Sequence, residues 1–195
     1  MSDVPHSPAE FFERYAPEHV ARLGGALGDR SSPGAVVFEL GSEGAWSLRL
    51  EQGRVAVARG VAEDALVRIT LSPEDFAVVV VGGAERLGDD AGLERQLVAV
   101  RALTLDAERA RLLRESAGSL RLRLTSPEGD RNLTLTLGGA APKLDAPDAE
   151  LGCALEDLWA IQSGVKNPFE LLMEGKLTIS GNMQLAMALG AALGT

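Results

Sequence analysis

The sequence predicts an α+β protein in which an antiparallel or mixed sheet is covered by helices. Segments that alternate apolar and polar residues, such as "WSLRLEQ" at 46–52, stand between segments with helix start signals. The order of strands followed by a helix then recurs in the second half of the chain. The 195 residues, 46% of them hydrophobic, suffice for one large domain or two small ones.

Composition and charge argue against several function classes. The net charge is −9 and the 19 Lys and Arg residues are scattered, whereas nucleic-acid binding requires a concentrated basic surface. The opening "MSDVPHSPAEFFERY" lacks the basic and apolar regions of a secretion signal, and no apolar run reaches the length of a membrane span. We therefore expect a cytoplasmic protein that binds no nucleic acid and makes at most transient membrane contact.

Catalytic and metal-binding patterns are also missing from the sequence. The single Cys153 cannot form an internal disulfide, and His6 and His19 stand too far from it for a zinc motif. No G-x-S-x-G, H-E-x-x-H or P-loop pattern occurs. We expect no enzymatic activity, no cofactor, no metal site and an inert core thiol at Cys153.

Residues 1–30 are predicted to form an N-terminal helical segment. Ser7 has the position of a cap, and Pro8 suits the first helical residue. Pro17 is expected to break or bend the helix. Three aromatic residues fall on one face of it: Phe11, Phe12 and Tyr15.

Residues 31–118 are predicted to form a first unit of sheet plus helix. Four segments have the alternation or apolar character of strands: 35–40, 46–52, 54–60 and 65–71. Ser72 and Pro73 then mark a helix start, and Gly82 is expected to end this helix. The four valines at 78–81 favour a strand, but the start and stop signals agree on a short buried helix.

Residues 119–195 are predicted to form a second unit that repeats the first. "SLRLRLTS" at 119–126 echoes the strand at 46–52, "RNLTLTLGG" at 131–139 echoes "RVAVARG", and "EDLWAIQSG" matches "EDFAVVVVG". Their common order favours duplication over a chance recurrence of amphipathic strands. Whether the two units form separate domains or one continuous sheet remains open.

The C-terminal segment is predicted to be helix, strand and helix. Asn167 and Pro168 start the first helix, and Gly175 ends it. A short strand, "KLTIS", follows, and Asn182 caps the last helix after Gly181. That last helix is apolar around nearly its whole circumference, so it must be buried, covered by a partner or cover an apolar ligand.

This closing segment resembles that of the sterol carrier protein 2 (SCP2-like) domain family. The resemblance rests on the order Phe169, Glu174-Gly175-Lys176-Leu177, Ile179, Gly181-Asn182 and the apolar helix that follows. "WSLRLEQG" and "ALVRITLSPEDF" are similar to earlier parts of the same fold, although the specific part covers only 164–189. The resemblance implies an SCP2-like fold and a non-enzymatic protein that carries or presents a lipid in an apolar tunnel.

The resemblance also implies which side chains contact a hydrophobic ligand such as a sterol, a fatty acyl chain or an isoprenoid. Methionines suit such a wall because their side chains are flexible and apolar. The candidate ligand-binding residues are Leu158, Ile161, Phe169, Leu172, Met173, Leu177, Ile179, Met183, Ala186 and Met187. The same side chains could instead pack an ordinary core.

An interaction module is the alternative function. In that interpretation the final helix binds a second copy of the chain or a partner enzyme, and no ligand is bound. A cavity of about 300 Å³ or more lined by the C-terminal Met and Phe residues would favour the lipid carrier. A filled core with an exposed apolar helix would favour the interaction module.

Overall fold

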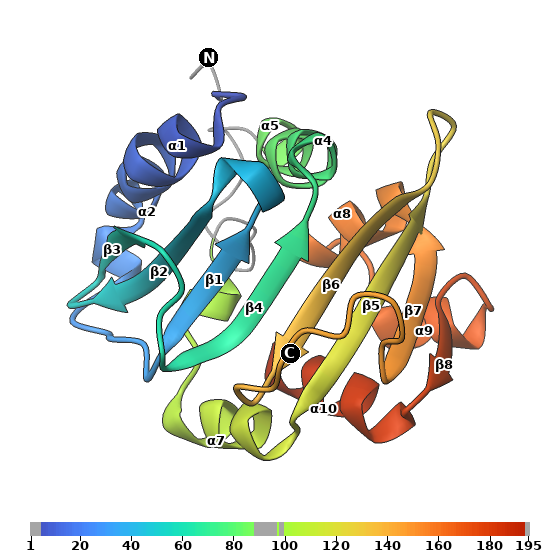
Figure 1. Ribbon diagram of the computed structural model, residues 1–195. Coiled ribbons are helices and arrows are strands. Elements are labelled where there is room, and N and C mark those ends of the chain that lie inside the picture. Colours follow the sequence, from blue (N-terminus) through green and yellow to red (C-terminus); the bar gives the residue numbers. More distant parts are fainter. Residues whose placement is uncertain (1–4, 88–96, 98–99, 194–195) are drawn as a thin grey trace.

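A computed structural model describes residues 5–87, 97 and 100–193, and one eight-stranded mixed sheet runs through it (Figure 1). The strand order is β3-β2-β1-β4-β6-β5-β7-β8. The strands are β1 (Ala35–Glu39), β2 (Ala45–Glu51), β3 (Arg54–Arg59), β4 (Ala65–Leu71), β5 (Gly118–Thr125), β6 (Arg131–Leu137), β7 (Ala149–Ala154) and β8 (Thr178–Gly181). The predicted α+β class with a mixed sheet is confirmed, and both halves of the chain contribute to the same sheet.

Helices and helical turns precede β1, lie in some of the connections between strands and follow β8. They are α1 (Pro8–Glu10), η1 (Phe11–Tyr15), α2 (Ala16–Arg22), α3 (Gly24–Leu27), η2 (Gly41–Glu43), α4 (Pro73–Asp75), η3 (Phe76–Val81), α5 (Gly82–Leu87), η4 (Arg101–Leu103), α7 (Ala107–Glu115), α8 (Leu155–Gln162), α9 (Pro168–Met173) and α10 (Met183–Leu193). None of the described helices is long and apolar enough to cross a membrane.

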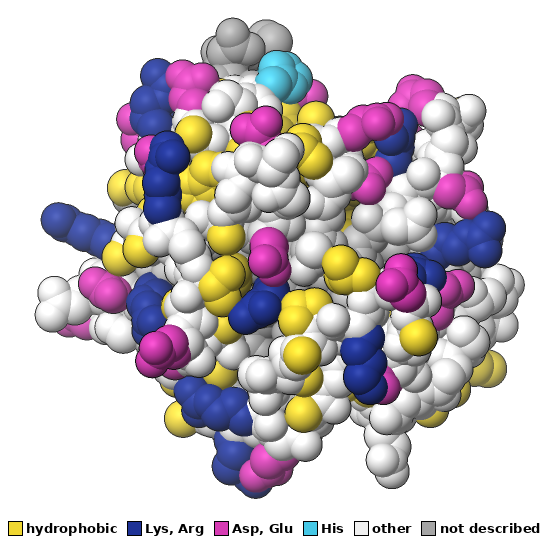
Figure 2. Space-filling model, in the orientation of Figure 1, with side chains coloured by type: hydrophobic (Ala, Val, Ile, Leu, Met, Phe, Trp, Pro, Cys, Tyr) yellow, Lys and Arg dark blue, Asp and Glu magenta, His cyan; other side chains and the backbone are white. Residues whose placement is uncertain are grey.

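The two faces of the sheet differ in character because successive strand residues point to opposite sides. On β5, Leu120 and Leu124 are buried in the core on the helix-covered face. Arg121 and Arg123 alternate with them and lie on the other face. Figure 2 shows acidic and basic side chains interspersed on the surface rather than segregated by sign. The sheet therefore has one apolar face under helices and one polar face.

The segment that connects β6 to β7, residues 138–148, crosses the polar face in front of β5 (Figure 1). Ser119 on β5 holds it by two hydrogen bonds: its hydroxyl accepts from the Lys143 N–H at 2.9 Å, and its carbonyl accepts from the Asp148 N–H at 2.7 Å. This crossing places β7 on the far side of β5, parallel to it.

The N-terminal helix is anchored by Phe12, whose side chain is only 1% exposed. Its ring lies 4.9 Å from that of Phe38, 5.4 Å from that of Trp46 and 5.3 Å from that of Phe76, measured between centroids. These rings come from β1, β2 and η3. Phe12 thus joins the N-terminal helix, two strands and the helix after β4 in one aromatic cluster.

The predicted break at Pro17 is wrong. Helical structure continues from Pro8 to Arg22, but the turns at Phe11–Tyr15 are π-helical. A proline ring conflicts with the carbonyl four residues earlier, here that of Glu13, which lies in this widened stretch. The wider turns just before Pro17 therefore accommodate it without ending the helix.

The helix predicted after β4 is confirmed, including its valine run. The Ser72 hydroxyl accepts a hydrogen bond from the Asp75 N–H at 3.0 Å, as expected of a cap. The predicted stop at Gly82 is wrong, because Gly82 has a right-handed φ of −59° and the helix continues to Leu87. A Cβ at the next residue, Gly83, would lie 3.0 Å from Trp159 Nε1. These glycines allow a close approach of α5 to Trp159 on α8.

The pairing pattern of the sheet occurs twice. Along β3-β2-β1-β4-β6 the successive pairs are antiparallel, antiparallel, parallel and antiparallel. Along β4-β6-β5-β7-β8 the same four relations recur in the same order. Each series of five strands therefore contains β4 and β6, so the two halves share these two strands.

This pattern corrects the predicted match between strands of the first and second units. It supports the predicted match between the helix at 74–82 and the helix at 156–164. The Glu-Asp pairs 74–75 and 156–157 both lie in the first turn of a helix that directly follows a strand with a parallel neighbour. That strand is β4, parallel to β1, in the first case and β7, parallel to β5, in the second. However, β5 occupies the place of β1, whereas the sequence comparison matched it with β2. Alternating apolar and polar residues look alike on any strand of the sheet, so the letters alone could not distinguish the two.

We predict that Phe12→Ala lowers the free energy of unfolding by about 3–5 kcal/mol, because it removes the ring at the centre of the aromatic cluster. Urea denaturation followed by circular dichroism measures the change. Phe169→Ala is the matched control, since 61% of the Phe169 side chain is exposed and we expect a loss below about 0.5 kcal/mol. Equal losses in the two variants would contradict the role of Phe12.

Candidate functional site

The candidate site is the C-terminal segment from α8 to α10, which is divided by three glycine turns. Gly164 precedes α9, Gly175 lies between α9 and β8, and Gly181 ends β8. Their φ angles of 68°, 71° and 78° are in the left-handed region, which favours glycine. The chain can therefore turn sharply at both ends of α9 and again before α10.

The predicted helix caps of this segment are confirmed. The Asn167 side chain accepts a hydrogen bond from the Phe169 N–H at 2.8 Å at the start of α9. The Asn182 side chain accepts one from the Leu185 N–H at 3.2 Å at the start of α10. Polar residues that satisfy the free N–H groups of a helix end are readable from sequence alone.

Helix α10 has one buried and one exposed face. Leu185 and Leu189 are buried in the core, whereas Met183 is 51% exposed and Met187 is 45% exposed. The two methionines are four residues apart, so they lie on the same side of the helix. Of the three sequence-based alternatives, complete burial is therefore wrong for the described residues of this helix.

Helix α9 exposes two of its apolar side chains. Phe169 is 61% exposed and Met173 is 87% exposed, and Val165 just before the helix is exposed as well. Leu172, one of the candidate ligand-binding residues, is half-buried, and the helix is anchored by Leu171, which is buried. The backbone carbonyl of Leu171 also accepts from the N–H groups of Lys176 and Leu177. This anchor was missed because Leu171 and Leu172 are adjacent and chemically identical.

The ten candidate residues thus do not line one enclosed wall. Four are exposed, namely Phe169, Met173, Met183 and Met187. Five are half-buried, namely Leu158, Ile161, Leu172, Leu177 and Ile179, and Ala186 is buried. Leu158, Leu177 and Ile179 pack against the hydrophobic core.

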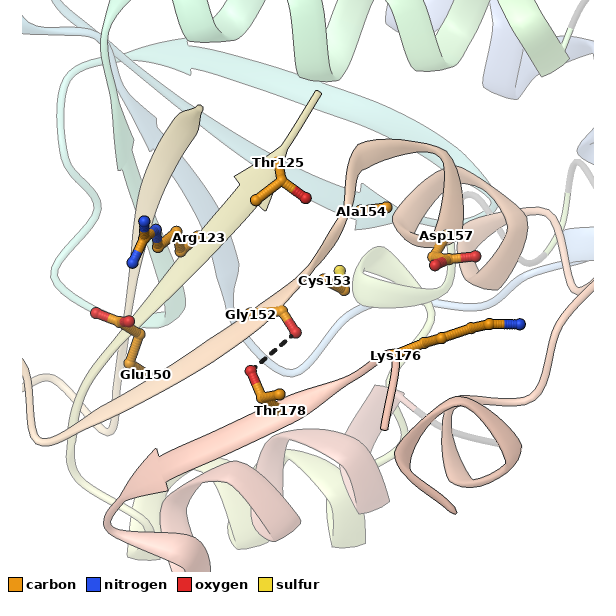
Figure 3. A pocket seen from close by; sticks show the side chains of 9 residues that line it. All are labelled: Arg123, Thr125, Glu150, Gly152, Cys153, Ala154, Asp157, Lys176 and Thr178. Atoms are coloured by element: carbon orange, nitrogen blue, oxygen red, sulfur yellow. Dashed lines mark hydrogen bonds between the residues drawn. The ribbon is translucent and has the colours of Figure 1, made fainter. Parts of the chain in front are cut away.

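Two pockets lie along the polar face of the sheet. Polar and charged residues predominate in the lining of the larger one, whereas Val and Ala make up half of the lining of the smaller one. The larger, of about 400 Å³, lies beside β5, β7 and β8 (Figure 3). Its described lining residues are Arg123, Thr125, Glu150, Gly152, Cys153, Ala154, Asp157, Lys176 and Thr178. The smaller, of about 210 Å³, is lined by Val61, Ala62, Glu63, Ala65, Arg68, Thr136, Gly139 and Ala140. Within the described part of the chain, neither lining includes any of the ten candidate residues.

The charged groups of the larger pocket have partners of opposite sign in the protein. Arg123 Nη2 lies 3.1 Å from Asp130 Oδ2, and Lys176 Nζ lies 2.7 Å from Glu174 Oε2. The two carboxylates are paired as well, Glu150 with Arg121 at 3.8 Å and Asp157 with Lys166 at 2.5 Å. The pocket therefore carries balanced charge and does not favour a ligand of one sign.

Cys153 lies on the wall of this pocket, but its thiol is buried. Burial raises the pKa of the Cys153 thiol to about 11, and the nearby Asp157 carboxylate adds to this shift. The reactive thiolate is consequently scarce at neutral pH. This environment fits the predicted inert core thiol.

We predict that Cys153 in the folded protein does not react with a disulfide reagent such as DTNB within minutes at about pH 8, because its pKa lies well above that pH. In guanidinium chloride the same thiol should react fully within seconds. Absorbance of the released thiolate measures both. Rapid labelling of the folded protein would show that the pocket wall opens to solvent.

Asp148 ties the start of α10 to the sheet. Its carboxylate accepts hydrogen bonds from Lys143 Nζ at 2.6 Å and from the Ser119 N–H at 2.9 Å. Its backbone carbonyl accepts from the Asn182 N–H at 2.7 Å. The hydrogen bond from Lys143, followed by that from Ser119, lowers the pKa of Asp148.

We predict that this carboxylate contributes to a loss of stability in acid. A lowered folded pKa means that the stabilisation is present above the unfolded pKa of about 3.9 and is lost as the pH falls through the folded pKa. The difference in unfolding free energy between about pH 6 and about pH 3 should therefore be smaller in Asp148→Asn than in the wild type. Asp145→Asn, an exposed change of the same kind in the same loop, is the control and should behave as the wild type.

Comparison with known proteins gives a match to one family model over part of the chain. Residues 99–194 match the model of the SCP-2 sterol transfer family. This match covers α7 to α10 and includes β5 to β8, but not β1 to β4. No curated protein sequence matches the chain.

Solved structures with partial likeness include SCP2-like proteins. Sterol carrier protein 2 like 2 from Aedes aegypti is 21% identical with a TM-score of 0.38, and the match covers 50% of this chain and 91% of that one. The palmitated form of SCP2L2 from Aedes aegypti is 19% identical with a TM-score of 0.39, and the match covers 51% of this chain and 94% of that one. The inverting sec-alkylsulfatase Pisa1 from Pseudomonas sp. is 17% identical with a TM-score of 0.32, over 52% of this chain and 15% of that one. Similarity at this level carries no inference about function.

Proposed function

We propose, because residues 99–194 match the model of the SCP-2 sterol transfer family, that the protein binds a hydrophobic lipid-type ligand and carries or presents it without catalysing a reaction. The observation that supports this most is the family match itself, and the exposed apolar residues Phe169, Met173, Met183 and Met187 lie within the matched segment. The ligand class is a sterol, a fatty acyl chain or an isoprenoid.

Exposed methionine and phenylalanine side chains on two helices provide an apolar surface that a lipid can cover. Each buried CH₂ of an acyl chain contributes about 0.8 kcal/mol, so a chain of about 16 carbons gains on the order of 12 kcal/mol before the costs of association. Such binding requires no charged contact. The flexible methionines adapt to ligands of different shape.

The sequence led us to expect an enclosed tunnel, and the exposure of these residues supports an open surface instead. The ligand would lie against α9, β8 and α10, with Leu177 and Ile179 at its base. Glycine turns at Gly164 and Gly175 bracket α9. We propose that α9 moves about these two turns to cover the bound lipid.

An interaction module is the second candidate, and a specific observation favours it. Buried apolar residues from the N-terminal helix, with Phe11, to α10, with Ala192, form one core cluster. Met173, in contrast, is 87% exposed. A filled core beside exposed apolar helices is what a protein interface requires before its partner binds. In this case the surface on α9 and α10 would bind a second copy or a partner enzyme.

We predict that Met187→Glu weakens lipid binding about 10- to 100-fold, because burying a methionine side chain against a ligand is worth about 1.5–3 kcal/mol. Titration with a fluorescent fatty acid and a fluorescent sterol measures the affinity. The thermal midpoint should stay within about 3 °C of the wild type, since Met187 is 45% exposed. Val61→Glu, at another exposed apolar position, is the control and should bind as the wild type.

Native mass spectrometry of the gently purified protein tests the proposal directly. A co-purifying lipid at about one per chain would support the carrier and name its ligand class. An apo mass, together with no uptake of either probe, would contradict it and leave the interaction module. If Met187→Glu loses folding and binding together, Met187 belongs to the core.

A further inference from the structure

Strand β8 is an edge strand whose counterpart in the first half of the sheet is not at an edge. In the repeated pairing pattern β8 occupies the fifth place, which β6 occupies in the first half. β6 pairs on its far side with β5, antiparallel. β8 pairs with β7 on one side, and the described residues supply no strand on its other side. Of the two equivalent strands, β6 therefore has a second antiparallel neighbour, and β8 has none among the described residues.

The two edges of the sheet differ in charge, although each contacts a helix, α2 at β3 and α10 at β8. β3 carries Arg54 and Arg59 at its ends and lies beside α2 (Figure 1). Charged residues and a covering helix are common protections of edge strands. β8 reads Thr-Ile-Ser-Gly and contains neither a charged residue nor a proline. Among the described residues no strand pairs with the outer side of β8, and its sequence contains none of these protections.

Electrostatic repulsion between two copies is small at this edge. The chain as a whole has a net charge of −9. The segment 165–195 contains two lysines and two glutamates, so its formal charge is zero, and 177–195 contains no charged residue. Two copies can therefore approach here without the repulsion that the rest of the surface would produce.

The exposed methionines lie on the helix that packs beside this strand. α10 begins directly after β8 and Asn182, and it contacts both β8 and β7. Met183 and Met187 are half exposed on its outer side. A partner that extends the sheet at β8 would also bring a second helical layer next to this side of α10.

We infer that β8 pairs antiparallel with β8 of a second copy of the chain. An antiparallel pair of identical strands has two-fold symmetry, which is the common arrangement of homodimers. The two eight-stranded sheets then form one continuous sheet, and the methionines of the two α10 helices lie on either side of the two-fold axis. This inference refines the interaction module and does not depend on a bound lipid.

Sedimentation equilibrium of the wild-type chain provides the first test, and we expect twice the chain mass of 20.5 kDa. Ser180 is exposed on the polar face of β8. Across a two-fold β8 pair its two copies lie opposite or diagonal to each other, so Ser180→Lys alone and Ser180→Glu alone each place like charges together. Each variant should weaken the dimer by up to about fivefold. An equimolar mixture of the two should restore it.

Ala58→Lys is the matched control, because Ala58 is exposed on the polar face of the other edge strand. This variant should remain a dimer. A monomeric wild type at millimolar concentration, or a dimer that Ala58→Lys weakens and the Ser180 variants do not, would overturn the inference. Titration of the Ser180 variants with the fluorescent lipids separates the two proposals. Lost dimerisation with retained lipid binding would show that the β8 interface and the lipid-binding surface are independent of each other.

Discussion

The antiparallel pairing of β4 with β6 is the interaction on which the rest of the structure depends. It joins Val67 to Leu137 and Leu71 to Leu133 across the middle of the sheet. These four side chains are buried, so the register places the apolar sides of both halves on the same face. A shift by one residue would turn one half over and separate its helices from the common core.

Sharing β4 and β6 also explains why the two halves cannot be treated as independent modules. Each strand completes the five-strand pattern of its own half and of the other half. The match to the SCP-2 sterol transfer family covers β6 but not β4. The segment that matches the family is therefore completed, in the folded protein, by a strand from outside it.

The two halves differ most in the helices that pack beside their parallel strand pairs. α7 contacts β4, and α10 contacts β7. The exposed residues of α7 include Arg111, Arg114 and Glu115, which suit a surface in contact with water. The exposed residues of α10 include Met183 and Met187. Most of the large apolar side chains exposed in the described residues therefore belong to the second half, although Val61 in the first half is exposed as well.

Local signals in the sequence determined the α+β class, most strand positions, the caps at Ser72, Asn167 and Asn182, and the resemblance to SCP2-like domains. These features depend on residues close together in the chain. The tertiary structure alone decided that β5 takes the place of β1, that Leu171 rather than Leu172 anchors α9, and that Phe169, Met173, Met183 and Met187 are exposed. The physical reason is that an apolar residue can pack in a core or face a ligand with the same local pattern. Which of these it does depends on strands and helices that are distant in sequence.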